Sequence, residues 1–181
     1  MTEDQQLLEQ IIARDVRAMG RLYERYLPRI SRFLYRVVQD SEAIPEVAND
    51  VMLTVWTNAS KFRGDSAVST WILGIAYRKG LDAGRKQQRY RQVLSAVRDD
   101  GPHAPSGIAE LVANRDLDVL LKALSPEQRA VAELCFGFGY SYPEIADMLD
   151  IPVNTVKTRM FYARQLMQAE LTDSEDPEGG G

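Results

Sequence analysis

Basic, hydroxyl and aromatic side chains gather in one short stretch of this chain, residues 154–164 (NTVKTRMFYAR). Lysine and arginine neutralise the phosphates of a DNA backbone, and a threonine hydroxyl can also bond a base edge in the major groove. Helical spacing leaves four polar side chains available to solvent or phosphate: Lys157, Thr158, Arg159 and Arg164. The stretch therefore offers the chemistry of DNA recognition.

The elements that would position these groups have the pattern of a helix-turn-helix over residues 141–164. Ser141 and Glu144 form a capping box, which predicts the start of a short helix. Ile151-Pro152 interrupts the helical pattern, and Asp150 tolerates the positive φ that such turns often need. Periodicity predicts a second helix from about Val153, with six inward residues on the pair: Ile145, Ala146, Leu149, Val156, Met160 and Ala163. A plain helical hairpin would show the same periodicity.

A second basic segment occupies residues 71–91. Its cationic residues are Arg78, Lys79, Arg85, Lys86, Arg89 and Arg91. Trp71, Tyr77 and Tyr90 lie among them, and aromatic side chains can stack on unpaired bases. This combination indicates a binding surface for single-stranded nucleic acid. The alternative is that Trp71 belongs to the core and the charges only solvate the end of a helix.

The distribution of charge sets the basic segments apart from an acidic remainder. The whole chain carries −4, yet residues 61–98 carry +7 and residues 99–153 carry −7. Phosphate neutralisation supplies most of the non-specific affinity for DNA, so an acidic total predicts weak unaided binding to duplex DNA.

A third predicted helix has its apolar stripe at residues 44–56, and four polar residues lie opposite that stripe: Glu42, Glu46, Asn49 and Asp50. Their spacing of three and four residues places them on one helix face. One interpretation is a solvated polar face, as most amphipathic helices have. The other is an acidic docking surface for a basic partner.

Composition argues against catalysis and against a metal site. The single histidine, His103, and the single cysteine, Cys135, cannot form a zinc site or an internal disulfide, so we expect no metal, no cofactor and no enzyme active site. Residues 136–139 (FGFG) lack a preceding strand and are interpreted as a helix end and turn, not a nucleotide loop. The chain shows neither a signal peptide nor an apolar run of the roughly 18 residues that span a bilayer, which favours a cytoplasmic location.

Helical periodicity recurs along the chain and predicts an all-α fold. Apolar stripes cover residues 8–26, ending near Pro28, and residues 30–38. Ser125 and Gln128 predict another helix start. Residues 92–112, rich in proline and glycine, predict a flexible strap between two small helical domains, and the acidic segment 172–181 predicts a disordered tail.

Four segments occur in the order found in bacterial sigma factors of the extracytoplasmic-function (ECF) type, which the chain resembles. They are NDVMLTVW (49–56), FRGDSAVSTWILGIA (62–76), LDAGRKQQR (81–89) and NTVKTRMFYAR (154–164). The resemblance implies a sigma-2-like domain at 1–95, a flexible linker at 96–112 and a sigma-4-like helix-turn-helix domain at 113–171. It implies a promoter-specificity subunit whose partners are core RNA polymerase (the β′ clamp helices and the β subunit), promoter DNA and an anti-sigma factor.

The resemblance also assigns roles to residues. Docking on the polymerase clamp helices would use Glu46, Asn49 and Asp50. The −10 element would be captured and held by Lys61, Phe62, Arg63, Asp65, Ser66, Trp71, Arg78, Lys79, Arg85, Lys86 and Arg89. The −35 element would be read from the helix that carries Asn154, Thr155, Lys157, Thr158, Phe161 and Tyr162, while Arg159 and Arg164 would contact phosphate or the domain's own acids.

Three positions depart from the pattern of the family. Arg78 stands where many relatives have asparagine, Tyr162 where arginine is frequent, and Ile44-Pro45-Glu46 where a pair of aspartates is usual. Two other classes stay open: a conventional helix-turn-helix regulator that binds duplex DNA without polymerase, and a helical enzyme or interaction module.

Overall fold

The computed structural model describes residues 1–38, 41–95 and 123–174, and every regular element in these ranges is helical. The N-terminal group comprises α1 (Glu3–Ile12), α2 (Val16–Val37), η1 (Ser41–Ala43), α3 (Ile44–Asn58), η2 (Ala59–Lys61) and α4 (Val68–Ser95). The C-terminal group comprises α6 (Pro126–Ala132), the π-helical turn η4 (Glu133–Gly137), α7 (Tyr142–Leu149) and α8 (Val153–Ser174). The predicted all-α fold is confirmed.

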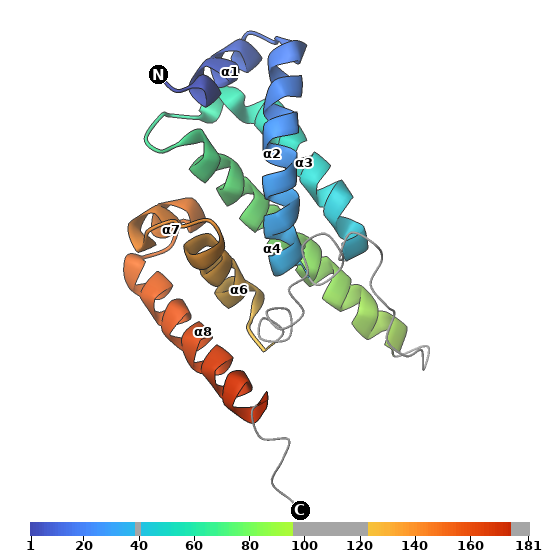
Figure 1. Ribbon diagram of the computed structural model, residues 1–181. Helices are drawn as coiled ribbons and strands as arrows, with labels where there is room; N and C mark the ends of the chain where they lie inside the picture. Colours follow the sequence, from blue (N-terminus) through green and yellow to red (C-terminus); the bar gives the residue numbers. More distant parts are fainter. Residues whose placement is uncertain (39–40, 96–122, 175–181) are drawn as a thin grey trace, which may run out of the picture.

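The long helices α2, α3 and α4 pack against one another, and α1 lies across one end of α2 (Figure 1). The C-terminal helices lie beside them, with α7 against α4 and α6 against α2. Leu134 and Ile145 belong to the same buried cluster as Phe33 and Ile72, so the two groups share one hydrophobic core. The sequence predicts two helical units but not this contact between them.

The apolar stripe predicted over residues 8–26 is divided between two helices, α1 and α2. Arg14 adopts a positive φ of 67°, and the Asp15 carboxylate accepts hydrogen bonds from the backbone N–H groups of Arg17 and Ala18, at 2.8 and 3.2 Å. This arrangement ends α1 and caps α2.

The prediction that the helical run ends near Pro28 is wrong, because α2 continues through this residue to Val37. A proline inside a helix removes one backbone hydrogen bond and costs about 3 kcal/mol. Tyr26 and Ile30 on either side of it are completely buried, and burial of such side chains is worth about 1.5–3 kcal/mol each. Packing thus outweighs the local cost.

Two predicted segments differ from the structure where it describes them. The first four residues of the predicted strap, 92–95, belong to α4, so the prediction that the strap begins at residue 92 is wrong. Residues 96–112 of the strap lie outside the described residues, as do residues 113–122 of the predicted sigma-4-like domain. Helix α8 continues to Ser174, so the prediction that disorder begins at residue 172 is wrong for the first three residues. Residues 175–181 lie outside the described part.

The predicted helix-turn-helix is confirmed as α7 and α8. The capping box of Ser141 and Glu144 begins α7, and Asp150 ends it with φ 55° and ψ 51°, in the left-handed region. Val156, Met160 and Ala163 are buried on the inner side of α8. The turn between α7 and α8 therefore depends on Asp150, a non-glycine residue in the left-handed conformation.

We expect Asp150→Val to lower the free energy of unfolding by about 1–2 kcal/mol, because a β-branched side chain is strained in the left-handed region. Asp150→Gly removes the same exposed carboxylate without that strain and should remain close to the wild type. Urea denaturation of the two variants measures the difference. Equal stability of the valine and glycine variants would contradict this account of the turn.

Candidate nucleic-acid interface

Helix α8 presents its polar and aromatic residues on one exposed side. Lys157 and Thr158 are exposed, and the rings of Phe161 and Tyr162 meet edge to face at 5.6 Å while remaining 57% and 51% exposed. Asn154 is exposed and Thr155 is half-buried. Large exposed aromatic rings beside a lysine and a threonine are unusual for a solvated face, and they suit contact with base edges.

The two arginines of α8 differ in their surroundings. Arg164 is exposed, lies 5.8 Å from the centre of the Phe136 ring and donates a hydrogen bond to Tyr142 Oη at 3.3 Å. Arg159 is half-buried and donates to Tyr77 Oη on α4, also at 3.3 Å. The sequence did not single out Phe136 or Tyr142 as supports for Arg164.

The loop between η2 and α4 holds the residues predicted to capture a base of the −10 element. Phe62 and Trp71 are half-buried with their ring centres 5.5 Å apart. Arg63 and Asp65 form an exposed ion pair at 3.0 Å around Gly64, which has φ 79°. Lys61 is exposed and Ser66 is half-buried. Trp71 therefore packs partly on the core and is partly exposed to solvent. It is neither a fully buried core residue nor a fully exposed stacking surface, the two alternatives considered from the sequence.

The cationic residues of α4 are mostly available. Arg78, Arg85, Lys86 and Arg89 are exposed, and Lys79 is half-buried. Tyr90 is 59% exposed, but Tyr77 is only 5% exposed. The suggestion that Tyr77 could stack on a base is wrong, because its ring is part of the core. Burial raises the pKa of Tyr77, against the opposing effect of Arg159.

The predicted docking residues Glu46, Asn49 and Asp50 are all exposed on α3. Tyr23 Oη donates a hydrogen bond to Asn49 Oδ1 at 2.8 Å, and Asp50 pairs with Lys79 of α4 at 3.7 Å. Two of the three predicted docking residues are therefore bonded to neighbouring helices, Asn49 to α2 and Asp50 to α4.

An apolar groove adjoins Asn49 and was not predicted. It has a volume of about 290 Å³ and is lined by Val16, Met19, Tyr23, Asn49, Met52, Leu53 and Trp56. Leu53 is 59% exposed and Val16 is 71% exposed. An exposed leucine outside the inward stripe of the helix is the signal in the sequence that could have revealed this surface.

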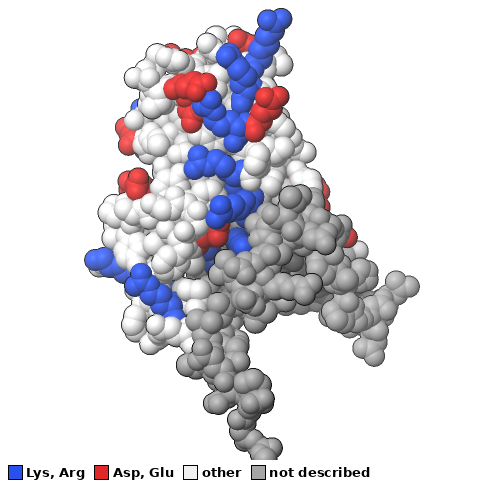
Figure 2. All heavy atoms as spheres, viewed as in Figure 1, with Lys and Arg blue, Asp and Glu red and all other residues white. Residues whose placement is uncertain are grey.

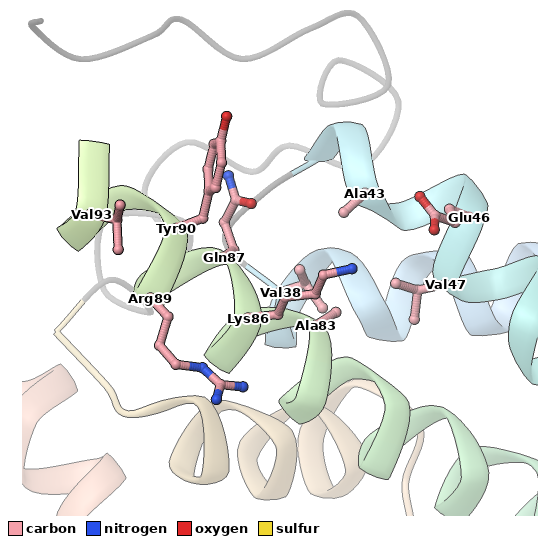
Figure 3. A pocket seen from close by; sticks show the side chains of 10 residues that line it. All are labelled: Val38, Ala43, Glu46, Val47, Ala83, Lys86, Gln87, Arg89, Tyr90 and Val93. Carbon is pink, nitrogen blue, oxygen red and sulfur yellow. The ribbon is translucent and has the colours of Figure 1, made fainter. Parts of the chain in front are cut away.

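A larger hollow lies between α3 and the C-terminal end of α4 (Figure 3). Its volume is about 570 Å³; Val38, Val47 and Ala83 supply apolar lining, while Glu46, Lys86 and Arg89 supply charge. The fold thus brings one predicted docking residue and two predicted −10 residues to the same hollow, although they lie on different helices.

Arginines recur along α2 at three- and four-residue spacing: Arg17, Arg21, Arg25, Arg29, Arg32 and Arg36. Such spacing places side chains along one side of a helix. Figure 2 shows cationic side chains in a column down the face on which α2 lies. This row was not predicted from the sequence.

Comparison with known proteins identifies the family. Residues 22–90 match Sigma-70 region 2, and residues 114–167 match Sigma-70, region 4. SigK of Mycobacterium tuberculosis (strain H37Rv), an ECF RNA polymerase sigma factor, is 31% identical over 163 residues, which cover 85% of this chain and 86% of that protein. The chain belongs to the ECF RNA polymerase sigma factor family. SigK of Mycobacterium sp. (strain KMS) is 29% identical over 160 residues, covering 85% of this sigma factor and 83% of that protein.

Two solved structures share the fold of this sigma factor. RpoE in complex with the anti-sigma factor NepR from Bartonella quintana superimposes with a TM-score of 0.70 at 21% identity, covering 87% of this chain and 98% of that one. CnrH in complex with the cytosolic domain of CnrY gives 0.69 at 23% identity, covering 96% and 99%. The resemblance noted in the sequence is confirmed, and the chain is a sigma subunit, a member of a family of non-enzymatic promoter-specificity subunits.

Within residues 1–38, 41–95 and 123–174, none of the helices combines the length and apolarity that a membrane crossing requires.

Proposed function

We propose that this sigma factor binds core RNA polymerase through α3, holds an opened −10 element on the 61–67 loop and α4, and reads the −35 element with α8. The observation that carries the proposal is the exposed side of α8, where Lys157, Phe161 and Tyr162 stand on a helix whose opposite side is packed. The second helix of a helix-turn-helix places its exposed side in the major groove of DNA.

The docking surface for polymerase combines charge and apolar contact. Glu46 and Asp50 supply negative charge to a basic partner, and the groove beside Asn49 supplies exposed apolar area at Leu53. A protein interface commonly has an apolar centre surrounded by polar groups, as this surface does.

The −10 surface combines a base-stacking pair with phosphate-binding cations. Phe62 and Trp71 form the aromatic pair, and Arg78 and Lys86 are exposed further along α4. Aromatic stacking contributes about 1–3 kcal/mol per base, and cations track the backbone of the unpaired strand.

The partners and compartment follow from the same assignment. We propose that an anti-sigma factor regulates this chain, since the two solved neighbours are bound to an anti-sigma factor and to a cytosolic domain, respectively. We further propose that it acts in the cytoplasm, without enzymatic activity of its own and without a metal or cofactor.

Transcription from a promoter library tests the proposal. We expect the purified chain with core polymerase to initiate on templates randomised over the −35 and −10 regions, and the productive templates to share two sequence blocks at a fixed spacing. Core polymerase alone is the control. A chain that binds polymerase but never initiates would contradict the proposal, and tight duplex binding without polymerase would indicate a conventional regulator.

A further inference from the structure

Arg164 of α8 is held by two aromatic residues that lie outside its own helix. Its guanidinium carbon lies 5.8 Å from the centre of the Phe136 ring, and its Nη2 donates a hydrogen bond to Tyr142 Oη at 3.3 Å. Phe136 belongs to the π-helical turn η4, and Tyr142 is the first residue of α7. Three elements of the C-terminal group thus meet at one cationic side chain.

The run 136–139 (FGFG), interpreted from the sequence as a helix end and turn, carries Phe136 to this place. A π-helical turn inserts one extra residue into a helix, which rotates the residues after it by about 100°. Leu134 of the turn is completely buried, whereas Phe136 is 60% exposed. Gly139, with φ 75°, then leads into the Ser141 cap of α7. The Phe136 ring therefore adds little to the core and lies where Arg164 can cover it.

The neighbours that hold Arg164 are uncharged. Among the residues that the structure describes, Arg164 forms no ion pair, whereas Arg63 pairs with Asp65 at 3.0 Å and Arg85 with Asp82 at 2.9 Å. An arginine paired with an acid must give up that pair before it can neutralise a phosphate. The family resemblance left two roles for Arg164, contact with phosphate or with acids of its own domain, and its uncharged neighbours favour phosphate.

Arg164 lies on the same side of α8 as two residues predicted to read bases. Lys157, Phe161 and Arg164 follow at spacings of four and three residues, and all three are exposed. Contacts to phosphate fix the position of a protein on the duplex, while contacts to base edges supply specificity. A long side chain loses rotamer freedom when it is immobilised on binding. The contacts with Phe136 and Tyr142 restrict Arg164 before any DNA is bound.

We propose that Phe136 and Tyr142 are positioning residues, which hold the Arg164 guanidinium where it binds a backbone phosphate of the −35 element and so fix the register of α8 in the major groove. This inference rests on the proposed function of α8. The phosphate can bind without breaking either contact, because a cation–π contact uses no N–H donor and the hydrogen bond to Tyr142 uses one of the five.

Substitutions in the full chain separate the two contacts. Phe136→Leu removes the aromatic face and keeps an apolar side chain, whereas Phe136→Tyr keeps the face and is the matched control. Tyr142→Phe removes only the hydroxyl. Phe136 is exposed and Tyr142 is half-buried at the surface, so these variants should fold, which urea denaturation checks. Arg164→Ala supplies a background in which both contacts are already lost.

The motion of the Arg164 Nε–H group, measured by ¹⁵N relaxation without polymerase, reports the positioning directly. We expect its order parameter to fall in Phe136→Leu and in Tyr142→Phe, and to fall further when the two are combined. Phe136→Tyr should keep the wild-type value. An unchanged order parameter in the combined variant would overturn the positioning of Arg164.

Binding of the polymerase-bound chain to a productive promoter template measures the consequence. We expect Phe136→Leu to weaken binding about two- to fivefold, the range of an exposed cation–π contact, and to do so alike for all −35 sequences. The salt dependence should stay as in the wild type, because the charge of Arg164 remains. In the Arg164→Ala background, Phe136→Leu should have no further effect, which a purely structural role of Phe136 would not produce.

Three other results would contradict parts of this account. Additive losses of affinity from Phe136→Leu and Arg164→Ala would overturn the action of Phe136 through Arg164. Tighter binding by Phe136→Leu would show that Arg164 must leave the ring to reach DNA, and would overturn the positioning role. A more mobile Arg164 in the variants, with no promoter binding even by the wild type, would support the positioning and overturn the proposed function instead.

Discussion

Reversing Glu46 and Asp50 to lysine should weaken binding of this sigma factor to core RNA polymerase by about 100-fold or more. Both carboxylates are exposed on α3, so the change alters a surface and not the core. Like charges brought together in an interface cost several kcal/mol, and each 1.4 kcal/mol is a factor of ten in affinity. The ion pair of the exposed Asp50 with the half-buried Lys79 lies near the surface and contributes about 1 kcal/mol or less to stability, so the fold should survive its loss.

The control for this experiment carries the same change in net charge elsewhere. Glu9→Lys with Glu24→Lys reverses two exposed acids on α1 and α2 that do not line the groove beside Asn49. Affinity for core polymerase is measured for both double variants at the same ionic strength, because exposed charges are screened by salt. Equal loss of affinity in the two would show a non-specific effect of charge. Unchanged affinity in the α3 variant would reject α3 as the docking site.

Replacing Lys157 and Thr158 by alanine should abolish most of the preference for the −35 sequence while leaving the −10 preference intact. Both side chains are exposed on α8, so truncation removes contacts to DNA and little packing. A good contact to a base edge is worth about 1–3 kcal/mol of discrimination, so losing two should reduce use of the preferred −35 sequence by at least about 30-fold. Transcription from templates randomised only over the −35 region measures the change.

Two further variants on α8 separate base reading from other effects. Gln165→Ala alters an exposed residue of the same helix and should leave the preference unchanged. Arg164→Ala should weaken all −35 sequences alike and reduce the salt dependence of binding by about one charge, as expected for a phosphate contact. If the Lys157 and Thr158 variant selects the same −35 sequences as the wild type, these residues do not read that element.

The functional surfaces that were not predicted from the sequence have a common origin. Leu53 was not assigned to the inward stripe of its helix, and its significance appears only when α2 brings Val16 and Tyr23 beside it. Phe136 lies in the run 136–139, which was interpreted as a turn. The guanidinium of Arg164 on α8 lies over its ring. In both cases a side chain acquires its role from a neighbour that is distant in the sequence.

What the sequence determined by itself is local. Both capping boxes, at Ser125 and at Ser141, and the left-handed turn at Asp150 were predicted and are confirmed. These features depend on contacts among residues three or four positions apart, which a single helix turn brings together. The order of the four family segments likewise indicates the sigma factor family, and it does not depend on how the helices pack.

What only the tertiary structure decided depends on residues far apart in the chain. The continuation of α2 through Pro28, the burial of Tyr77 and the convergence of Arg32 on Glu133 all require packing between elements. Arg32 and Glu133 are separated by 101 positions, and no periodicity within either helix signals the pairing. Burial and charge pairing between residues so far apart in the sequence depend on how whole helices pack against one another. Local sequence patterns could therefore predict the helices but not the contact between the N-terminal and C-terminal groups.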